Sequence, residues 1–147
     1  MRLAYVVGVV GAIIGQRAFP SAVIGARSLT SWIGLVIVWC GAGLRFWSFR
    51  TLGHYFTFTV QTSADQPVIS AGPYRVIRHP SYAGVLLAAG GVGLVISNWA
   101  SLAFLVASIT CGLGYRINIE ERALSEDLGG RYQSYARSRK RLVPYIW

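Results

Sequence analysis

The chain has 147 residues, of which 54% are hydrophobic and only 13% are charged, and its formal net charge is +9. A disordered chain is excluded because disorder requires low hydrophobicity. An ordinary soluble core is also disfavoured, because a small domain cannot hide so much apolar surface. We therefore expect an integral membrane protein that forms a single domain over residues 1–147 and keeps its few charges outside the lipid.

Four apolar stretches predict four transmembrane helices. A lipid-exposed sheet edge is not tolerated in hydrocarbon, so the spans are expected to be α-helical and the fold all-α. The third and fourth stretches share one uncharged run, broken only by the polar residues Ser97 and Asn98, which predicts a tight helical hairpin. The expected spans cover about residues 3–19, 29–49, 80–97 and 99–121.

Small residues recur four apart in the third span, at Gly84 and Ala88 and again at Ala89 and Gly93. In lipid, such spacing lets helix backbones approach closely. The pattern predicts close helix packing, either within this chain or in a homodimer.

The first span has two interpretations. Met1-Arg2 before an apolar run, followed by Ala18-Phe19-Pro20-Ser21-Ala22, is also typical of a cleaved signal peptide. We expect a retained helix, because the other three spans would otherwise lack packing partners.

Basic residues set the expected orientation. With a cytoplasmic N-terminus, twelve of the fourteen lie on or next to the cytoplasmic side, as the positive-inside rule requires. We therefore expect a multi-pass protein of the cell (inner) membrane with both termini cytoplasmic, a cytoplasmic loop at 50–79 and a cytoplasmic tail at 122–147.

Two other classes of site are considered from the sequence, a nucleic-acid site and a metal site. Nucleic-acid binding is an alternative, but membrane orientation already accounts for the charge, so we expect membrane lipids and no nucleic acid as partners. The two histidines and two cysteines lie far apart in the sequence, which predicts no metal site.

Residues suited to chemistry lie just before the third span and at the end of the fourth. Pro80 suits the first turn of a helix, so His79 is expected at a helix N-terminus, where free N–H groups favour an anion. Arg116 and Glu120 are four apart and share a helix face, whereas Glu121 points about 100° away. Surface ion pairs are the ordinary interpretation, but charges where a helix leaves lipid usually line a polar cavity.

Two separated motifs carry a family resemblance. Residues 72–84 read GPYRVIRHPSYAG, and after two spans residues 116–124 read RINIEERAL. The pair resembles the isoprenylcysteine carboxyl methyltransferase family, within a wider group that includes phospholipid N-methyltransferases. The resemblance covers roughly residues 45–145 and is specific because both motifs agree. Smaller matches are Arg50-x-Leu52-Gly53, Gln66-x-Val68, Tyr132-x-x-Tyr135 and the basic end before Pro144.

The resemblance implies an S-adenosylmethionine-dependent methyltransferase without a Rossmann domain, whose product is S-adenosylhomocysteine. It implies that the cytoplasmic loop and the C-terminal segment form the cofactor pocket, and that Arg116 and Glu120 are catalytic. The cofactor-binding residues it implies are Gln66, Val68, Tyr74, Arg78, His79, Tyr82, Glu120 and Glu121.

The acceptor determines which further groups are needed. A carboxylate is already ionised at neutral pH, so it needs a cationic anchor, for which Arg116 is the candidate, and no general base. An amine or thiol would require Glu120 or His79 to remove a proton. We expect methylation of a carboxylate on a lipophilic or lipidated substrate that enters from the bilayer.

Other functions remain open. A phospholipid N-methyltransferase or a thiol S-methyltransferase is the alternative among enzymes, and a non-catalytic membrane scaffold or lipid-binding protein is the alternative from another class. Among acceptors, a fatty acid or another membrane-soluble acid is as compatible with the residues as isoprenylcysteine.

Overall fold

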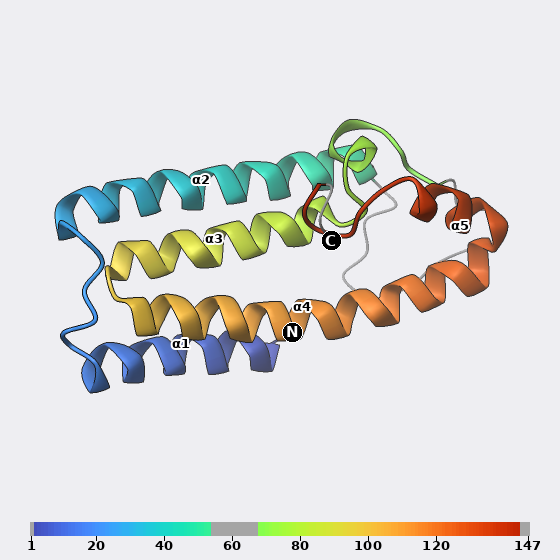
Figure 1. Ribbon diagram of the computed structural model, residues 1–147. Coiled ribbons are helices and arrows are strands. Elements are labelled where there is room, and N and C mark those ends of the chain that lie inside the picture. Colours follow the sequence, from blue (N-terminus) through green and yellow to red (C-terminus); the bar gives the residue numbers. More distant parts are fainter. Residues whose placement is uncertain (1, 54–67, 145–147) are drawn as a thin grey trace. The chain divides into compact units, whose positions relative to one another are not determined.

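The structure is a computed structural model that describes residues 2–53 and 68–144 (Figure 1). Within these residues the all-α prediction is confirmed, and a helix lies at each of the four apolar stretches. In chain order the elements are α1 (Arg2–Ala18), α2 (Arg27–Leu52), the 3₁₀ helix η2 (Gly72–Arg75), α3 (Pro80–Ile96), α4 (Trp99–Leu128) and α5 (Gly130–Arg137).

The hairpin between α3 and α4 is as tight as the sequence predicts. Only Ser97 and Asn98 separate the two helices, and Ser97 has a positive φ of 56°. The Asn98 side chain accepts a hydrogen bond from the Ser101 backbone N–H at 3.0 Å, which caps the start of α4. Polar residues thus break the apolar run because they satisfy the backbone groups of the turn.

The fourth helix is longer than the predicted span. It continues past residue 121 to Leu128 and stops at Gly129, whose φ of 53° favours glycine. The short helix α5 then begins at Gly130, and the sequence analysis did not predict it. Its signal was present in the glycine pair and in the Tyr132-x-x-Tyr135 spacing, which places both rings on one helix face.

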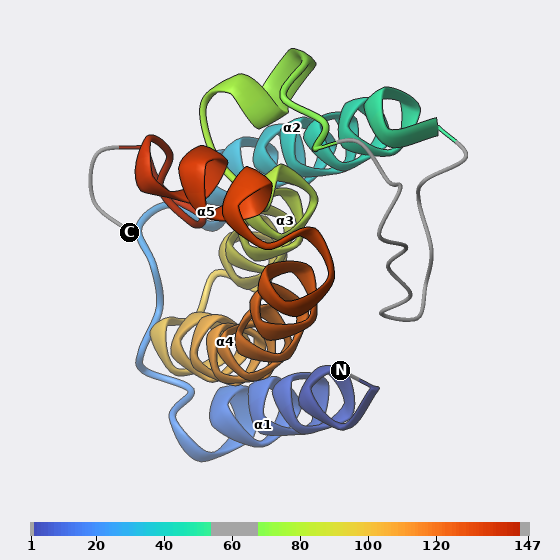
Figure 2. The ribbon, with the colours of Figure 1, turned by 90° about the vertical axis from the view of Figure 1, so that its right-hand side faces the viewer.

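The chain divides into two compact units. The first unit, Met1–Gly43 with Gly84–Gly114, contains α1, most of α2 and α3, and the first half of α4. Its helices are neighbours in the order α2, α3, α4, α1 (Figures 1 and 2). The second unit, Leu44–Ala83 with Tyr115–Trp147, contains both sequence motifs except for Gly84, the last residue of the first motif.

The first helix is tied to the α3–α4 hairpin by buried polar bonds. Ser101 Oγ donates to the Ala12 carbonyl oxygen at 2.7 Å, and Asn98 Nδ2 donates to the Phe19 carbonyl oxygen at 2.9 Å. Gly8 faces α4, where an added Cβ would lie in ordinary van der Waals contact, 3.4 Å from Ser108 Cβ and 3.6 Å from Leu105 Cδ2. The expected packing role of the first span is therefore present in the first unit.

Glycines let α2 and α3 approach each other closely. A methyl group at Gly34 would lie 2.6 Å from the Gly91 carbonyl oxygen, and one at Gly41 would lie 2.6 Å from that of Gly84. Ala88 contacts the same position of α2 as Gly84 does. Of the expected small-residue pairs, Gly84 with Ala88 thus serves packing inside the chain.

Replacing Gly34 with alanine is expected to destabilise the first unit, because the added methyl group collides with backbone that cannot rotate away. Gly43 is the matched control on the same helix, since nothing lies within 4 Å of its Cβ position. There, alanine should be neutral or stabilising by up to about 1 kcal/mol through its higher helix propensity. Thermal unfolding in detergent measures both, and equal midpoints for the two variants would contradict the close contact.

Two helices, α2 and α4, are long and apolar enough to cross a membrane, and α3 is a shorter apolar helix. The apolar window of α2 is 11% buried and that of α4 is 28% buried, so neither resembles a core helix of a soluble protein. Large side chains such as Trp32 and Trp39 are 67% and 71% exposed. With 17 residues, α1 and α3 each reach about 25 Å, slightly less than the hydrocarbon thickness of about 30 Å.

Candidate functional site

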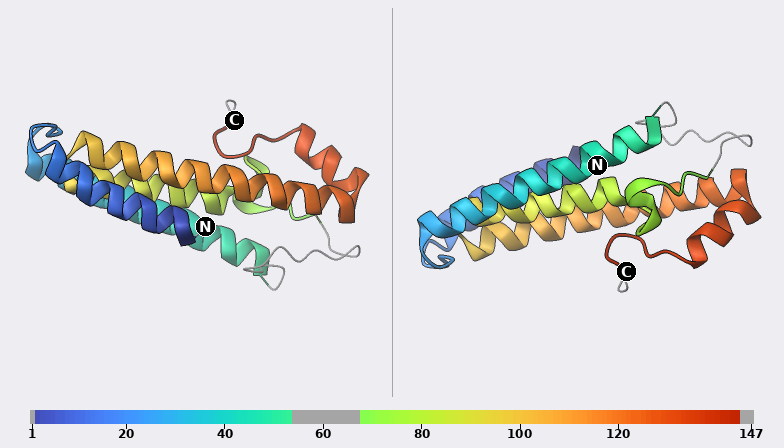
Figure 3. Two further views of the ribbon diagram at one scale, coloured as in Figure 1. Left: turned by 90° about the horizontal axis from the view of Figure 1, so that it is seen from below. Right: turned by 90° about the horizontal axis from the view of Figure 1, so that it is seen from above.

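The candidate site is built from three segments of the second unit. They are the chain from η2 into the first turn of α3, the end of α4, and the chain after α5 (Figure 3). The first two carry the two sequence motifs, and the third returns to lie beside the first. A parallel bridge between Ile77 and Lys140 marks where they meet.

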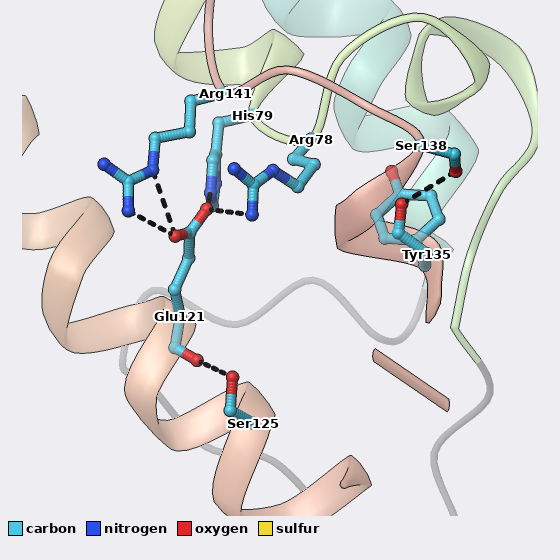
Figure 4. Close-up of polar contacts among 7 residues, drawn as sticks. All are labelled: Arg78, His79, Glu121, Ser125, Tyr135, Ser138 and Arg141. Carbon is cyan, nitrogen blue, oxygen red and sulfur yellow. Dashed lines mark hydrogen bonds and ion pairs between the residues drawn. The ribbon is translucent and has the colours of Figure 1, made fainter. Parts of the chain in front are cut away.

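The carboxylate of Glu121 lies at the centre of a cationic cluster (Figure 4). Arg78 Nη1 lies 2.9 Å from its Oε1, and His79 Nε2 lies 3.0 Å from the same oxygen. Arg141 contacts the other oxygen, Oε2, with Nη2 at 2.9 Å and Nε at 3.1 Å. The Glu121 side chain is only 11% exposed, so these partners compensate a charge that has lost most of its water.

The geometry also indicates which nitrogen of the His79 ring carries a hydrogen. A carboxylate only accepts hydrogen bonds, so Nε2 is the nitrogen that donates to Glu121. His79 is 5% exposed and directly precedes α3, as predicted. Its backbone N–H donates to the Arg141 carbonyl oxygen at 3.0 Å. The residue is therefore held through both its ring and its backbone.

A second polar group forms around the Tyr82 hydroxyl. This hydroxyl donates to Glu120 Oε2 at 2.6 Å and accepts from Arg116 Nε at 2.6 Å. The phenol therefore bridges a cation and a carboxylate that lie one turn apart on α4. Glu120 and Glu121 face different partners, as the 100° separation predicts.

The beginning of α3 also contacts the end of α2. Arg45 Nη1 donates to Ser81 Oγ at 3.3 Å, and its guanidinium lies 4.7 Å from the ring centroid of Phe49. Ser81 is buried and follows Pro80 in the motif. An arginine of α2 therefore also contacts the motif, and this residue was not predicted as part of the site.

Three tyrosines of the second unit are protonated at neutral pH. Burial raises the pKa of Tyr74 and Tyr132 well above the ordinary value, and it raises the pKa of Tyr135 to about 12 despite the opposing charge of Arg139. The Tyr135 hydroxyl donates to the Tyr74 carbonyl oxygen at 2.8 Å. These phenols can act as hydrogen-bond donors but not as bases.

The structure brings together most of the predicted site residues. The contacts above join Arg78, His79 and Glu121 in one cluster and Tyr82, Arg116 and Glu120 in the other. Tyr74 is buried in η2. Val68 lies partly exposed in irregular chain before η2, and Gln66 lies outside the described residues. In the part of the chain that the structure describes, no group of three or more His, Cys, Asp or Glu could hold a metal ion.

The sequence analysis missed Arg141 as an individual site residue. The signal was the basic end before Pro144, which was recognised only as a stretch. Three arginines and one lysine lie at 137 and 139–141, and only the return of the chain shows which of them reaches Glu121.

Comparison with known sequences identifies the relatives of this chain. A family profile described as the isoprenylcysteine carboxyl methyltransferase (ICMT) family matches residues 32–126. A probable protein-S-isoprenylcysteine O-methyltransferase of Oryza sativa subsp. indica is 30% identical over 118 residues, which cover 79% of this chain and 62% of that protein. Methanethiol S-methyltransferase 2 of Bradyrhizobium diazoefficiens is 25% identical over 140 residues, which cover 89% of this chain and 53% of that protein.

A solved structure has the same fold. The eukaryotic intramembrane Ras methyltransferase ICMT superposes with a TM-score of 0.80 at 28% sequence identity, over 99% of this chain and 52% of that one. Together with the exposed apolar helices, this similarity identifies an integral membrane fold. The chain spans about three fifths of the rice relative and about half of the solved structure.

Proposed function

This chain belongs to the isoprenylcysteine carboxyl methyltransferase family, and we propose that it methylates a lipophilic substrate in the membrane with S-adenosylmethionine as methyl donor. The acceptor in this proposal is a carboxylate, so the product is a methyl ester. The rice relative is named as an O-methyltransferase, which supports this choice.

The observation that carries the proposal is the Tyr82 bridge between Arg116 and Glu120. It holds a cation and a carboxylate side by side at the end of an apolar helix, where a substrate in the bilayer could present a charged head. A guanidinium keeps its positive charge at every physiological pH, and its planar fork of N–H donors matches the geometry of a carboxylate. Arg116 is therefore the candidate anchor for a carboxylate acceptor.

The cofactor proposal is supported by the donors around Glu121. Arg78 and Arg141 outnumber the single carboxylate they share, so the cluster has surplus positive charge even with a neutral His79. Within the described residues, the buried side-chain atoms without a hydrogen-bond partner are Arg78 Nε and Tyr132 Oη, both of which can donate. Surplus cations and unused donors fit the carboxylate of S-adenosylmethionine.

The residue roles follow from these charges. Arg78, His79 and Glu121 would hold the amino-acid end of the cofactor, and Glu120 would attract its ammonium or ribose hydroxyls. The apolar walls for the adenine would come from Tyr74, Tyr82 and Val68, with Gln66 assigned to the cofactor by family resemblance. When bound, S-adenosylmethionine supplies an activated methyl group on its sulfonium.

The chain would contribute to the reaction mainly by placement. An ionised carboxylate needs no proton removed, so Arg116 orients it and Glu120 keeps Arg116 and Tyr82 aligned. Positioning of two reactants and exclusion of water are the main sources of rate in such a displacement.

The membrane arrangement is part of the same proposal. We propose four spans in the cell (inner) membrane, with both termini in the cytoplasm. This arrangement would put the second unit, with all site residues, on the cytoplasmic side. In this arrangement the whole chain is one methyltransferase domain, with the loop at 50–79 and the tail from 122 contributing to the cofactor pocket.

Thiol S-methylation is a second candidate, favoured by the similarity to a methanethiol S-methyltransferase. A thiol must lose its proton before it attacks, and its pKa of about 8.5 calls for a base. Glu120, which already accepts a hydrogen bond from Tyr82, is the group that would take this role.

Product chemistry tests the proposal. The purified full chain in detergent is incubated with methyl-labelled S-adenosylmethionine and either native lipid extract or an S-prenylated N-acetylcysteine. We expect label that is released as methanol by mild base, which identifies a methyl ester. A base-stable methylamine or thioether would overturn the carboxylate assignment, and failure of the wild type to bind S-adenosylhomocysteine in calorimetry would overturn the methyltransferase assignment.

A further inference from the structure

The chain after α5 is paired with the motif segment that precedes α3. The Arg78 N–H donates to the Lys140 carbonyl oxygen at 2.8 Å, and the His79 N–H donates to that of Arg141 at 3.0 Å. Leu142, at 2% exposure, anchors the segment next to these bonds. The backbone of residues 140–142 is therefore fixed against residues 77–79.

Arg141 connects this pairing to α4. Its carbonyl oxygen holds the backbone of His79, while its guanidinium holds Glu121 Oε2 through two nitrogens. One residue of the C-terminal segment thus contacts the two motif residues whose ring and carboxylate bond to each other. Neither motif contains Arg141.

The division of the Glu121 oxygens makes the contribution of Arg141 separable. Arg78 and His79 both approach Oε1, and the contacts of Oε2 among the described residues come from Arg141. Removing the Arg141 guanidinium would leave one face of the carboxylate unrestrained. The carboxylate could then rotate, and the His79 ring would lose its fixed acceptor.

We propose that Arg141 is a positioning residue, which acts through Glu121 to hold His79 and Arg78 in the arrangement that receives the cofactor. It is not proposed as a catalytic residue, because its guanidinium acts on Glu121 and not on the reacting groups. The inference rests on the proposed function in one respect: it identifies the ligand of the cluster as S-adenosylmethionine.

A double-mutant cycle tests this role. The full chain is prepared as wild type, Arg141→Gln, Glu121→Gln and the double variant, and the affinity for S-adenosylhomocysteine is measured by calorimetry. We expect Arg141→Gln to weaken binding about tenfold, as for loss of a charge-assisted hydrogen bond, and to raise KM for the cofactor more than it lowers kcat. The double variant should bind no more weakly than Glu121→Gln, because Arg141 acts through that carboxylate.

Two further variants separate positioning from general structural damage. Lys140→Gln removes the same charge from the adjacent exposed residue and keeps its backbone carbonyl, so it should bind like wild type. Arg141→Lys keeps a cation near Glu121 and should recover part of the affinity. Multiplicative losses in the double variant, or wild-type affinity and KM in Arg141→Gln, would overturn the proposal.

A measurement without cofactor distinguishes failure of this inference from failure of the proposed function. Amide hydrogen exchange over residues 76–79 should accelerate in Arg141→Gln and stay unchanged in Lys140→Gln. If the wild type does not bind S-adenosylhomocysteine but exchange responds as expected, the methyltransferase proposal fails and the positioning of His79 stands. If the wild type binds and neither affinity nor exchange responds to Arg141→Gln, the inference alone fails.

Discussion

Replacing Arg116 with glutamine is expected to lower turnover about 100-fold, because the acceptor carboxylate loses the cation that orients it and a small misplacement of a reactant costs about that much in rate. Affinity for S-adenosylhomocysteine should stay close to that of the wild type, because the cofactor contacts proposed above do not include Arg116. The measurements are kcat with a lipophilic carboxylate acceptor and calorimetric binding of the product.

The Tyr82 bridge makes the prediction more specific. Tyr82→Phe keeps the Arg116 charge but removes the hydroxyl that bonds Nε and Glu120. It should therefore reduce turnover less than Arg116→Gln does, because the cation remains and loses only its bond to Tyr82. Arg122→Gln removes the same charge from an exposed position of α4 and serves as the control. Loss of cofactor affinity in Arg116→Gln as severe as in a Glu121 variant would refute this division of roles.

Local rules were sufficient to predict the helices near the site. Pro80 begins α3, and the two polar residues Ser97 and Asn98 form the hairpin, because both effects act within one turn of the chain. The separation of Glu120 from Glu121 also follows from helix geometry alone. Hydropathy predicts only the apolar part of α4, to about residue 121, whereas the helix itself continues to Leu128 and stops where Gly129 permits a positive φ.

Contacts made by the C-terminal segment after α5, where it folds back onto the segment before α3, could not be predicted from the sequence. Arg141 reaches Glu121 only because residues 140–142 pair with residues 77–79, and nothing in the local sequence specifies that pairing. The same holds for Tyr82, which was assigned to the cofactor by resemblance and is found to bridge Arg116 and Glu120. The spacing of the motifs therefore predicted which residues lie in the site. The partner that each side chain contacts depends on the tertiary structure.

Replacing Glu121 with glutamine is expected to have the largest effect on the protein as a whole. The amide has nearly the same shape but no charge, so Arg78 and Arg141 would face each other without a carboxylate between them. Breaking a buried ion pair by removing one partner costs about 3–5 kcal/mol, and the low end applies here because Arg141 is 33% exposed. The thermal unfolding midpoint in detergent should fall accordingly.

The same variant should also lose affinity for S-adenosylhomocysteine, because His79 Nε2 would lose its anionic acceptor and Arg78 would no longer be held at the cluster. Glu126→Gln removes an equal charge from an exposed position of α4 and should leave both stability and binding unchanged. A Glu121→Gln protein that unfolds earlier but binds the product normally would show that the cluster only joins the C-terminal segment to α4. Because the cluster would then hold no ligand, the surplus charge of Arg78 and Arg141 would need another explanation.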